Sequence, residues 1–243
     1  MNAFTRFSAQ AAAEHPGDRL EGLRAGVEGR IVFTTSFGLE DQAVAHLIFT
    51  RGLDIELATL DTGRLFPSTY RVWDDTERRY GARIRSFHPD QAALAGYIAG
   101  AGINGFYGSK PARLGCCHVR KVEPLGRALA GASAWVTGLR SGQSAGRSTV
   151  ELSAWDEARG LIKFAPLFDW TRERVADFCA AEGVPVNALH AQGYPSIGCE
   201  PCTRAVAPGE PERSGRWWWE NDEATECGLH LGPDGRLVRS KAA

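Results

Sequence analysis

Long apolar runs are missing from this sequence of 243 residues. No stretch approaches the roughly 20 consecutive apolar residues that a helix needs to cross a bilayer, so we expect no membrane-spanning segment. Residues 1–7 lack the basic-then-apolar pattern of a secretory signal, and the chain shows no internal repeats or low-complexity tracts. These absences argue against a membrane or repeat protein and predict a globular protein of the cytoplasm.

An excess of charge of one sign is missing as well, since 28 Lys and Arg stand against 29 Asp and Glu, a formal charge of −1. We therefore expect no nucleic acid and no membrane surface as partner, and any anion must be bound by local clusters of Arg and Lys. The length suits one α/β domain with appendages better than two full domains.

Short β-branched or apolar runs alternate with helical patterns along the chain. Strands are expected at 31–35, 55–60, 83–87, 134–137 and 162–165, and helices within 1–30 and at 42–50, 67–80, 90–100, 117–130 and 172–182. This alternation predicts an α/β fold with a three-layer, Rossmann-like, mostly parallel sheet. Ligands of such sheets lie beyond the carboxyl ends of the strands, where turns rich in Gly and small polar residues occur at 36–38, 61–63 and 138–140.

The character of the chain changes after Arg204. Residues 207–212 have the composition of a flexible linker, and the residues after them have little room for a core of their own. We therefore divide the chain into a main domain, 1–204, and a mobile C-terminal tail, 205–243. The run Trp217 to Trp219 is expected to dock the tail on the main domain, with a base-stacking platform as the alternative.

Six cysteines are unusual in a reducing compartment and point to metal or redox chemistry rather than to disulfides. Cys199 and Cys202 form a CxxC, and Cys116 and Cys117 are adjacent. Adjacent cysteines project in divergent directions and rarely reach one zinc ion together, whereas an iron–sulfur cluster offers each a different iron atom. The pattern favours a cluster, with a structural zinc site or four unrelated buried cysteines as alternatives.

The other two cysteines differ in their surroundings. Cys179 lies within a helical pattern, which predicts a core residue. Cys227 lies in the polar tail, where cations such as Arg213, Arg216 or His230 would lower the pKa of an accessible thiol. A reactive thiol and an inert surface thiol are equally consistent with this position.

Basic residues fall at places where a ligand would lie. Lys121 follows the cysteine pair by four residues, Arg140 and Arg147 bracket a Gly- and Ser-rich loop, and Arg213 and Arg216 precede the tryptophans. The guanidinium group suits bidentate binding of phosphate or sulfate. Each residue alone is typical of a solvated surface charge, but together they predict an anion site.

Taken together, several motifs resemble the assimilatory adenylyl-sulfate (APS) reductases of the PAPS/APS reductase family. They are SFGLED (36–41), LDTGRLFP (60–67), CCHVRK (116–121), GCEPCT (198–203), and the tail from GRWWWE (215–220) through ECGLH (226–230). The resemblance covers residues 30–230 and implies an adenine nucleotide α-hydrolase-like fold, related to the ATP pyrophosphatases. Those enzymes carry SGGxDS in the first turn, so the turn here offers a less complete pyrophosphate cradle.

The resemblance also implies an activity and a site. The thiolate of Cys227 would attack the sulfur of adenosine 5′-phosphosulfate, and thioredoxin or a glutaredoxin-like dithiol would then release sulfite, in assimilatory sulfate reduction and cysteine biosynthesis. His230 would be the second catalytic residue, and a [4Fe-4S] cluster would be held by Cys116, Cys117, Cys199 and Cys202. The implied substrate-binding residues are Ser36, Phe37, Gly38, Leu60, Lys121, Gly138, Arg147, Arg213 and Arg216.

Three other functions remain open. A reductase of the 3′-phosphorylated nucleotide is the nearest, although such relatives usually lack the four cluster cysteines. An ATP pyrophosphatase or tRNA thiolase would share the fold, but the altered first turn and the net charge count against it. A non-catalytic zinc or iron–sulfur module would leave Cys227 and the basic residues unexplained. A monomer and a homo-oligomer are both compatible with the sequence.

Overall fold

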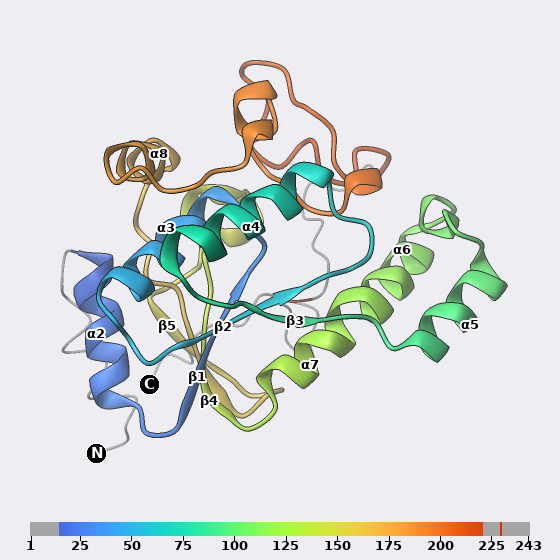
Figure 1. Ribbon diagram of the computed structural model, residues 1–243. Helices are drawn as coiled ribbons and strands as arrows, with labels where there is room; N and C mark the ends of the chain where they lie inside the picture. Colours follow the sequence, from blue (N-terminus) through green and yellow to red (C-terminus); the bar gives the residue numbers. More distant parts are fainter. Residues whose placement is uncertain (1–14, 221–228, 230–243) are drawn as a thin grey trace.

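The computed structural model describes residues 15–220 and Leu229 (Figure 1). Within this part of the chain one sheet has six strands in the order β3-β2-β1-β4-β6-β5, all parallel except β5, which is antiparallel to β6. The strands are β1 (Arg30–Thr35), β2 (Glu56–Leu60), β3 (Arg85–Phe87), β4 (Ala132–Val136), β5 (Ser153–Asp156) and β6 (Leu161–Phe164). The predicted mostly parallel α/β fold is confirmed, and only β5 has no counterpart among the predicted strands.

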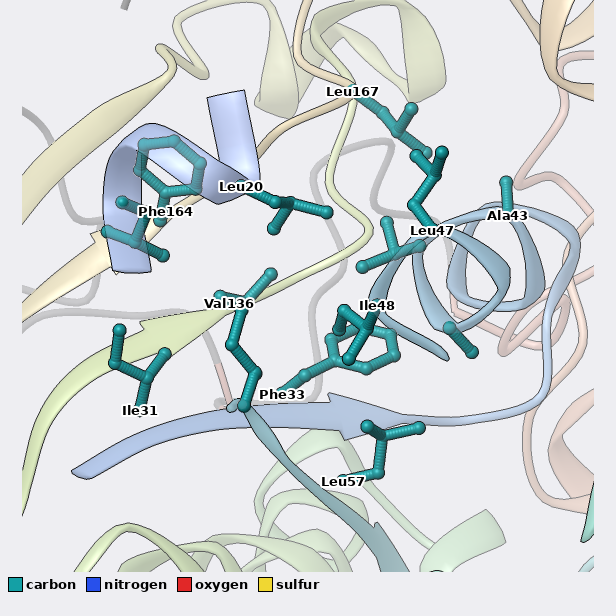
Figure 2. Close-up of a cluster of buried hydrophobic side chains, with 14 of the residues drawn as sticks. Leu20, Ile31, Phe33, Ala43, Leu47, Ile48, Leu57, Val136, Phe164 and Leu167 are labelled. Carbon is teal, nitrogen blue, oxygen red and sulfur yellow. The ribbon is translucent and has the colours of Figure 1, made fainter. Parts of the chain in front are cut away.

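Helices cover both faces of the sheet. The helices are α2 (Pro16–Gly26), α3 (Leu39–Thr50), α4 (Pro67–Tyr80), α5 (Gln91–Ala101), α6 (Lys110–Cys117), α7 (Glu123–Leu129) and α8 (Arg172–Ala181). Successive residues of β1 point to opposite faces: Phe33 packs with α2, α3 and α8, whereas Val32 packs with α7. Figure 2 shows Leu20, Leu47 and Ile48 of the helices on the first of these faces.

The predicted helix at 117–130 is interrupted. Between α6 and α7 the residues His118–Val122 form a π-helical turn, in which the N–H of Glu123 bonds to the carbonyl of His118. Pro124 has no N–H to donate and its ring would clash with the carbonyl four residues before it, which disfavours a continuous α-helix. Lys121 therefore lies in a π-helical turn, within the stretch that was predicted to be helical.

The first part of the predicted tail is packed on the main domain. Thr203 and Arg216 form an antiparallel bridge, and the Trp217 side chain is only 2% exposed. Docking by the tryptophan run is thus confirmed for Trp217. Glu212, at the end of the stretch with linker composition, is half-buried in an ion pair with Arg140. The division at residue 204 stays a prediction.

Among the described residues, no helix is both long and apolar enough to cross a membrane.

Candidate functional site

A cavity lies at the carboxyl ends of β1, β2 and β4, and residues between 195 and 217 line it as well. In the sheet, β2 and β4 lie on opposite sides of β1. The connections that follow β1 and β4 therefore run in opposite directions at the carboxyl ends of the strands. Such a switch point is where open parallel sheets bind ligands. The cavity is lined by eight of the nine predicted substrate-binding residues: Ser36, Gly38, Leu60, Lys121, Gly138, Arg147, Arg213 and Arg216.

The turn after β1 is folded back on the first turn of α3. Both the N–H and the Oγ of Ser36 donate to Oδ2 of Asp41, over 2.6 and 2.7 Å. Phe37 adopts a left-handed conformation with φ of 58°, and its ring stacks on Trp73 with centroids 5.5 Å apart. The Phe37 side chain therefore lies in the core and, unlike those of its neighbours, does not line the cavity.

Gly138 brings the turn after β4 against the same helix. A Cβ at this position would stand 2.3 Å from Oδ1 and 3.2 Å from the backbone N of Asp41. No real side chain fits this space, so only glycine permits the approach. The close contact fixes the wall of the cavity between β1 and β4.

Two acids at the start of α3, the buried Glu40 and the half-buried Asp41, are absent from the predicted site residues. Burial raises the pKa of Asp41 to about 6, with a contribution from the charge of Glu40 and against the hydrogen bonds from Ser36. Burial also opposes ionisation of Glu40, but the charge and hydrogen bond of Arg140 hold the pKa of Glu40 below its ordinary value. Their signal in the sequence was their place at the end of the SFGLED motif (36–41).

The cations of the cavity come from three distant parts of the chain and are more buried than surface charges. Arg147 and Arg216 are 6% and 8% exposed. Arg147 donates to Oε1 of Gln143 over 2.6 Å, and the Arg216 guanidinium lies 4.7 Å from the centroid of the Trp217 ring. The interpretation of these residues as solvated surface charges is wrong for Arg147 and Arg216, because their guanidinium groups are buried in the protein.

Arg140 was grouped in the sequence with the candidate anion-binding residues, but it does not line the cavity. Its side chain lies between two carboxylates, with Nε 2.8 Å from Glu40 and Nη2 2.9 Å from Glu212. It thereby joins α3 to the segment that carries Arg213 and Arg216. Burial, together with the charge of Glu40, raises the pKa of Glu212 despite the opposing charge of Arg140.

The four cysteines at 116, 117, 199 and 202 lie together, although the two pairs are far apart in the sequence. They form one buried group with Phe106 and Trp217 and line a second, smaller cavity. Lys121, Cys199 and Trp217 line both cavities, so the cysteine group and the cation-lined cavity share a wall. Within the described residues, no three His, Cys, Asp or Glu side chains are arranged to hold a single metal ion.

Basic residues surround this group of cysteines. Burial opposes ionisation of Cys199, but Lys121, a 3.3 Å contact with Oγ1 of Thr62, and nearby arginines lower the pKa of its thiol. Arg113 and Arg120 also line the cysteine cavity and were not predicted as site residues, although Arg120 lies within the CCHVRK motif and Arg113 shortly before it. Arg113 pairs with Glu220, and Arg120 donates to the carbonyl of Thr62 over 2.6 Å, so both are fixed inside the protein.

The remaining predictions for cysteine fall on different parts of the chain. Cys179 is 2% exposed within the main core, as expected. Cys227 and His230, the predicted catalytic residues, lie outside the described residues. Their neighbour Leu229 is described, and it lines the cavity that the cations line.

Comparisons with known proteins agree with this geometry. Residues 30–205 match the family described as the phosphoadenosine phosphosulfate reductase domain. An adenosine 5′-phosphosulfate reductase of Rhizobium meliloti (strain 1021) is 58% identical over 209 residues, covering 86% of this chain and 79% of that protein. A protein of the same name from Sinorhizobium fredii (strain USDA 257) is 54% identical over 235 residues, covering 93% of this chain and 94% of its own.

Solved structures show a similar fold. The crystal structure of phosphoadenylyl-sulfate reductase from Candida auris, in a phosphate complex, aligns with a TM-score of 0.70 at 23% identity, covering 84% of this chain and 96% of that one. Yeast FAD synthetase in complex with FAD aligns with a TM-score of 0.50 at 12% identity, covering 84% and 74%. At these identities the likeness concerns the fold alone.

Proposed function

We propose, from the premise that this chain belongs to the phosphoadenosine phosphosulfate reductase domain family, that it reduces adenosine 5′-phosphosulfate to sulfite and AMP. The reaction would serve assimilatory sulfate reduction and cysteine biosynthesis. Relatives at 54–58% identity bear the name adenosine 5′-phosphosulfate reductase. The observation that carries the proposal is the cavity at the switch point, where four cations converge beside four grouped cysteines.

The cavity offers two ends with different chemistry. Ser36, Gly38, Leu60 and Gly138 line the strand-end side, where small residues and backbone groups suit the adenosine. Lys121, Arg147, Arg213 and Arg216 supply the positive charge that a phosphate joined to a sulfate requires. Phe37 would contribute only its backbone, because its ring is in the core.

The first chemical step is a transfer of the sulfo group to Cys227. The thiolate attacks the sulfur, a new S–S bond forms, and the bond from sulfur to the bridging oxygen breaks, so that AMP leaves with the electron pair. His230 acts at the same end of the substrate from the tail. Cations fixed in advance lower the barrier, since negative charge builds on the departing phosphate.

The second step returns the enzyme to its thiol form. One thiolate of a thioredoxin or glutaredoxin-like protein attacks the Cys227 sulfur and releases sulfite, and its second thiol then resolves the mixed disulfide. The dithiol is oxidised to a disulfide and supplies the two electrons of the reduction. We place the reaction in the cytoplasm, where such dithiols and the six cysteines of this chain stay reduced.

Cys116, Cys117, Cys199 and Cys202 would hold a [4Fe-4S] cluster. They fit it because they are grouped in one buried site that Arg113, Arg120 and Lys121 also line, which suits a set of thiolates. When bound, the cluster supplies a fixed charge beside the anion site, on the wall that Lys121 shares with the cavity. Neither step above requires it to carry electrons.

The proposal is tested by sulfite release from adenosine 5′-phosphosulfate and from its 3′-phosphorylated analogue, each with thioredoxin supplied. We expect the unphosphorylated nucleotide to be preferred, whereas the reverse preference would establish the 3′-phosphorylated substrate. ATP-dependent release of pyrophosphate would instead support an ATP pyrophosphatase.

The nucleophile is tested with Cys227→Ser and sulfur-labelled nucleotide. We expect no labelled protein from this variant, while a Cys179→Ala control, changed at a core thiol that does not line the cavity, should still be labelled. A covalent sulfo-adduct on Cys227→Ser would rule out Cys227 as the nucleophile.

A further inference from the structure

A short turn between α5 and α6 covers one side of the cysteine group. It is a single turn of 3₁₀-helix, η1 (Gly105–Tyr107), and nothing in the proposed reaction uses it. Phe106 belongs to the same buried group as the four cysteines and is 2% exposed. The nearby Ile103 and Tyr107 are exposed. The turn therefore lies between the cysteine group and solvent.

Arg64, from the LDTGRLFP motif, holds this turn with its side chain. Nη2 donates to Oδ1 of Asn104 over 2.6 Å, Nη1 donates to the carbonyl of Ile103 over 3.3 Å, and the guanidinium carbon lies 5.5 Å from the centroid of the Phe106 ring. The carbonyl of Arg64 accepts a bond of 2.8 Å from the N–H of Glu200, between the two cysteines of the CxxC. Arg64 thus connects the turn to the cysteine group, and its planar fork fixes the turn at several points.

A second bond ties the turn to the CxxC directly. The hydroxyl of Tyr107 donates to the carbonyl of Pro201 over 2.7 Å, and the Tyr107 ring packs edge-on against Trp219 with centroids 4.5 Å apart. Pro201 lines the smaller cavity together with Phe106 and Arg64. The turn is therefore a fixed part of the wall around the cysteines.

The cysteine group also borders the cation-lined cavity, across the wall that contains Cys199. We propose that the η1 turn seals the cysteine group from solvent, so that small molecules reach the group through the cation-lined cavity. Arg64 and Tyr107 are positioning residues that act through Phe106. An apolar shell of this kind controls how far solvent reaches a metal centre. The inference rests on the proposed iron–sulfur site.

The test follows the visible absorbance of protein purified without oxygen while EDTA removes its iron, with and without AMP. We expect AMP, which would fill the cavity, to slow the loss several-fold in the wild type. Loss should be about tenfold faster in Arg64→Met and about fivefold faster in Tyr107→Phe, the effects of one hydrogen bond from a charged and from a neutral group on the opening of the turn. AMP should hardly protect either variant, because the chelator then has a second route.

Arg79→Met and Tyr80→Phe are the matched controls. Arg79 donates to the carbonyl of Glu182 and lies over the ring of Tyr80, whose hydroxyl is 2.9 Å from Nδ1 of His46. Both residues belong to α4, and neither lines the two cavities. They should lose iron at the wild-type rate. A variant that is merely less stable keeps the cavity as its route and stays protected by AMP, so full protection of Arg64→Met and Tyr107→Phe would overturn the seal.

Alkylation of the metal-free protein by iodoacetamide, read by peptide mass spectrometry, separates the seal from the cluster. We expect Cys116 and Cys202 to react several-fold faster in Arg64→Met than in the wild type or in Arg79→Met. Cys179, in the main core, should react equally slowly in all three proteins, which excludes general unfolding as the cause. If the wild type holds no iron when purified, the proposed cluster fails, yet these rates still decide the seal. Equal rates at Cys116 and Cys202 in all three proteins would refute it.

Discussion

Gly138 and Asp41 meet so closely that a Cβ on the glycine would stand 2.3 Å from Oδ1 of the acid. Gly138→Ala should therefore push the first turn of α3 away from β4 and distort the cavity wall. We expect the dissociation constant of AMP to rise at least tenfold and the free energy of unfolding to fall by about 1–3 kcal/mol, as for an overpacked interior. Calorimetric titration and urea denaturation measure the two effects.

Gly96→Ala is the control for this substitution. Gly96 lies within α5, and a Cβ there would meet no atom within 4 Å. Alanine should stabilise that helix slightly and leave AMP binding unchanged. If both variants bind AMP like the wild type, the contact with Asp41 does not shape the cavity.

Asp41 should make the stability of the protein depend on pH in an unusual direction. Because burial raises its pKa to about 6, the folded protein holds a proton that the unfolded chain, with a carboxyl pKa near 3.8, has already lost. The stabilisation is fully present below pH 3.8 and is lost as the pH rises through 6, by up to about 3 kcal/mol.

The measurement compares urea unfolding of wild type and Asp41→Asn from pH 4.5 to 7.5. The wild type should lose stability relative to the variant as the pH rises. Asp54→Asn, which removes an exposed carboxyl, should run parallel to the wild type throughout. A difference between wild type and Asp41→Asn that does not change with pH would contradict the raised pKa.

The strand-end residues of the site were predictable because their signals are local. Apolar runs mark β1, β2 and β4, and parallel strands bring their carboxyl ends to one edge, so turns with Ser36, Gly38 and Gly138 had to meet there. The grouping of the cysteines followed from their residue types and spacing. For the strand-end turns and the cysteine group, local pattern and composition were thus sufficient for a correct prediction.

The parts that were missed depend on contacts between distant residues. Arg140 pairs with Glu40, 100 residues away, and with Glu212, 72 residues away, and no local pattern encodes such a triad. The ring of Phe37 enters the core only because its backbone takes a positive φ, which is rare for a bulky side chain. Strand β5 was missed because residues 153–156 lack a marked alternation of apolar and polar residues.

Arg140 should contribute more to the free energy of unfolding than an exposed cation does. Arg140→Met removes the cation that pairs with Glu40 and, among the described residues, leaves Glu212 paired with Arg172, 3.9 Å away. A buried charge that loses its partner costs about 3–5 kcal/mol, and the segment with Arg213 and Arg216 should bind AMP more weakly. Urea denaturation and AMP titration measure both losses.

Two further variants sharpen this test. Adding Glu212→Gln to Arg140→Met should recover part of the stability, since it removes one of the unpaired carboxylates. Arg78→Met breaks the exposed pair with Asp75 and should change little. Equal losses in Arg140→Met and Arg78→Met would mean that the buried triad does not hold the segment.

The cysteine group should bind iron rather than a single zinc ion. Protein purified without oxygen should be brown and contain about four irons per chain, because four grouped thiolates match the ligand set of a [4Fe-4S] cluster. Cys199→Ser removes the thiol that lines both cavities and should lower both the iron content and the affinity for AMP. Cys179→Ala, in the main core, should keep its iron, and a colourless wild type with one zinc per chain would refute the cluster.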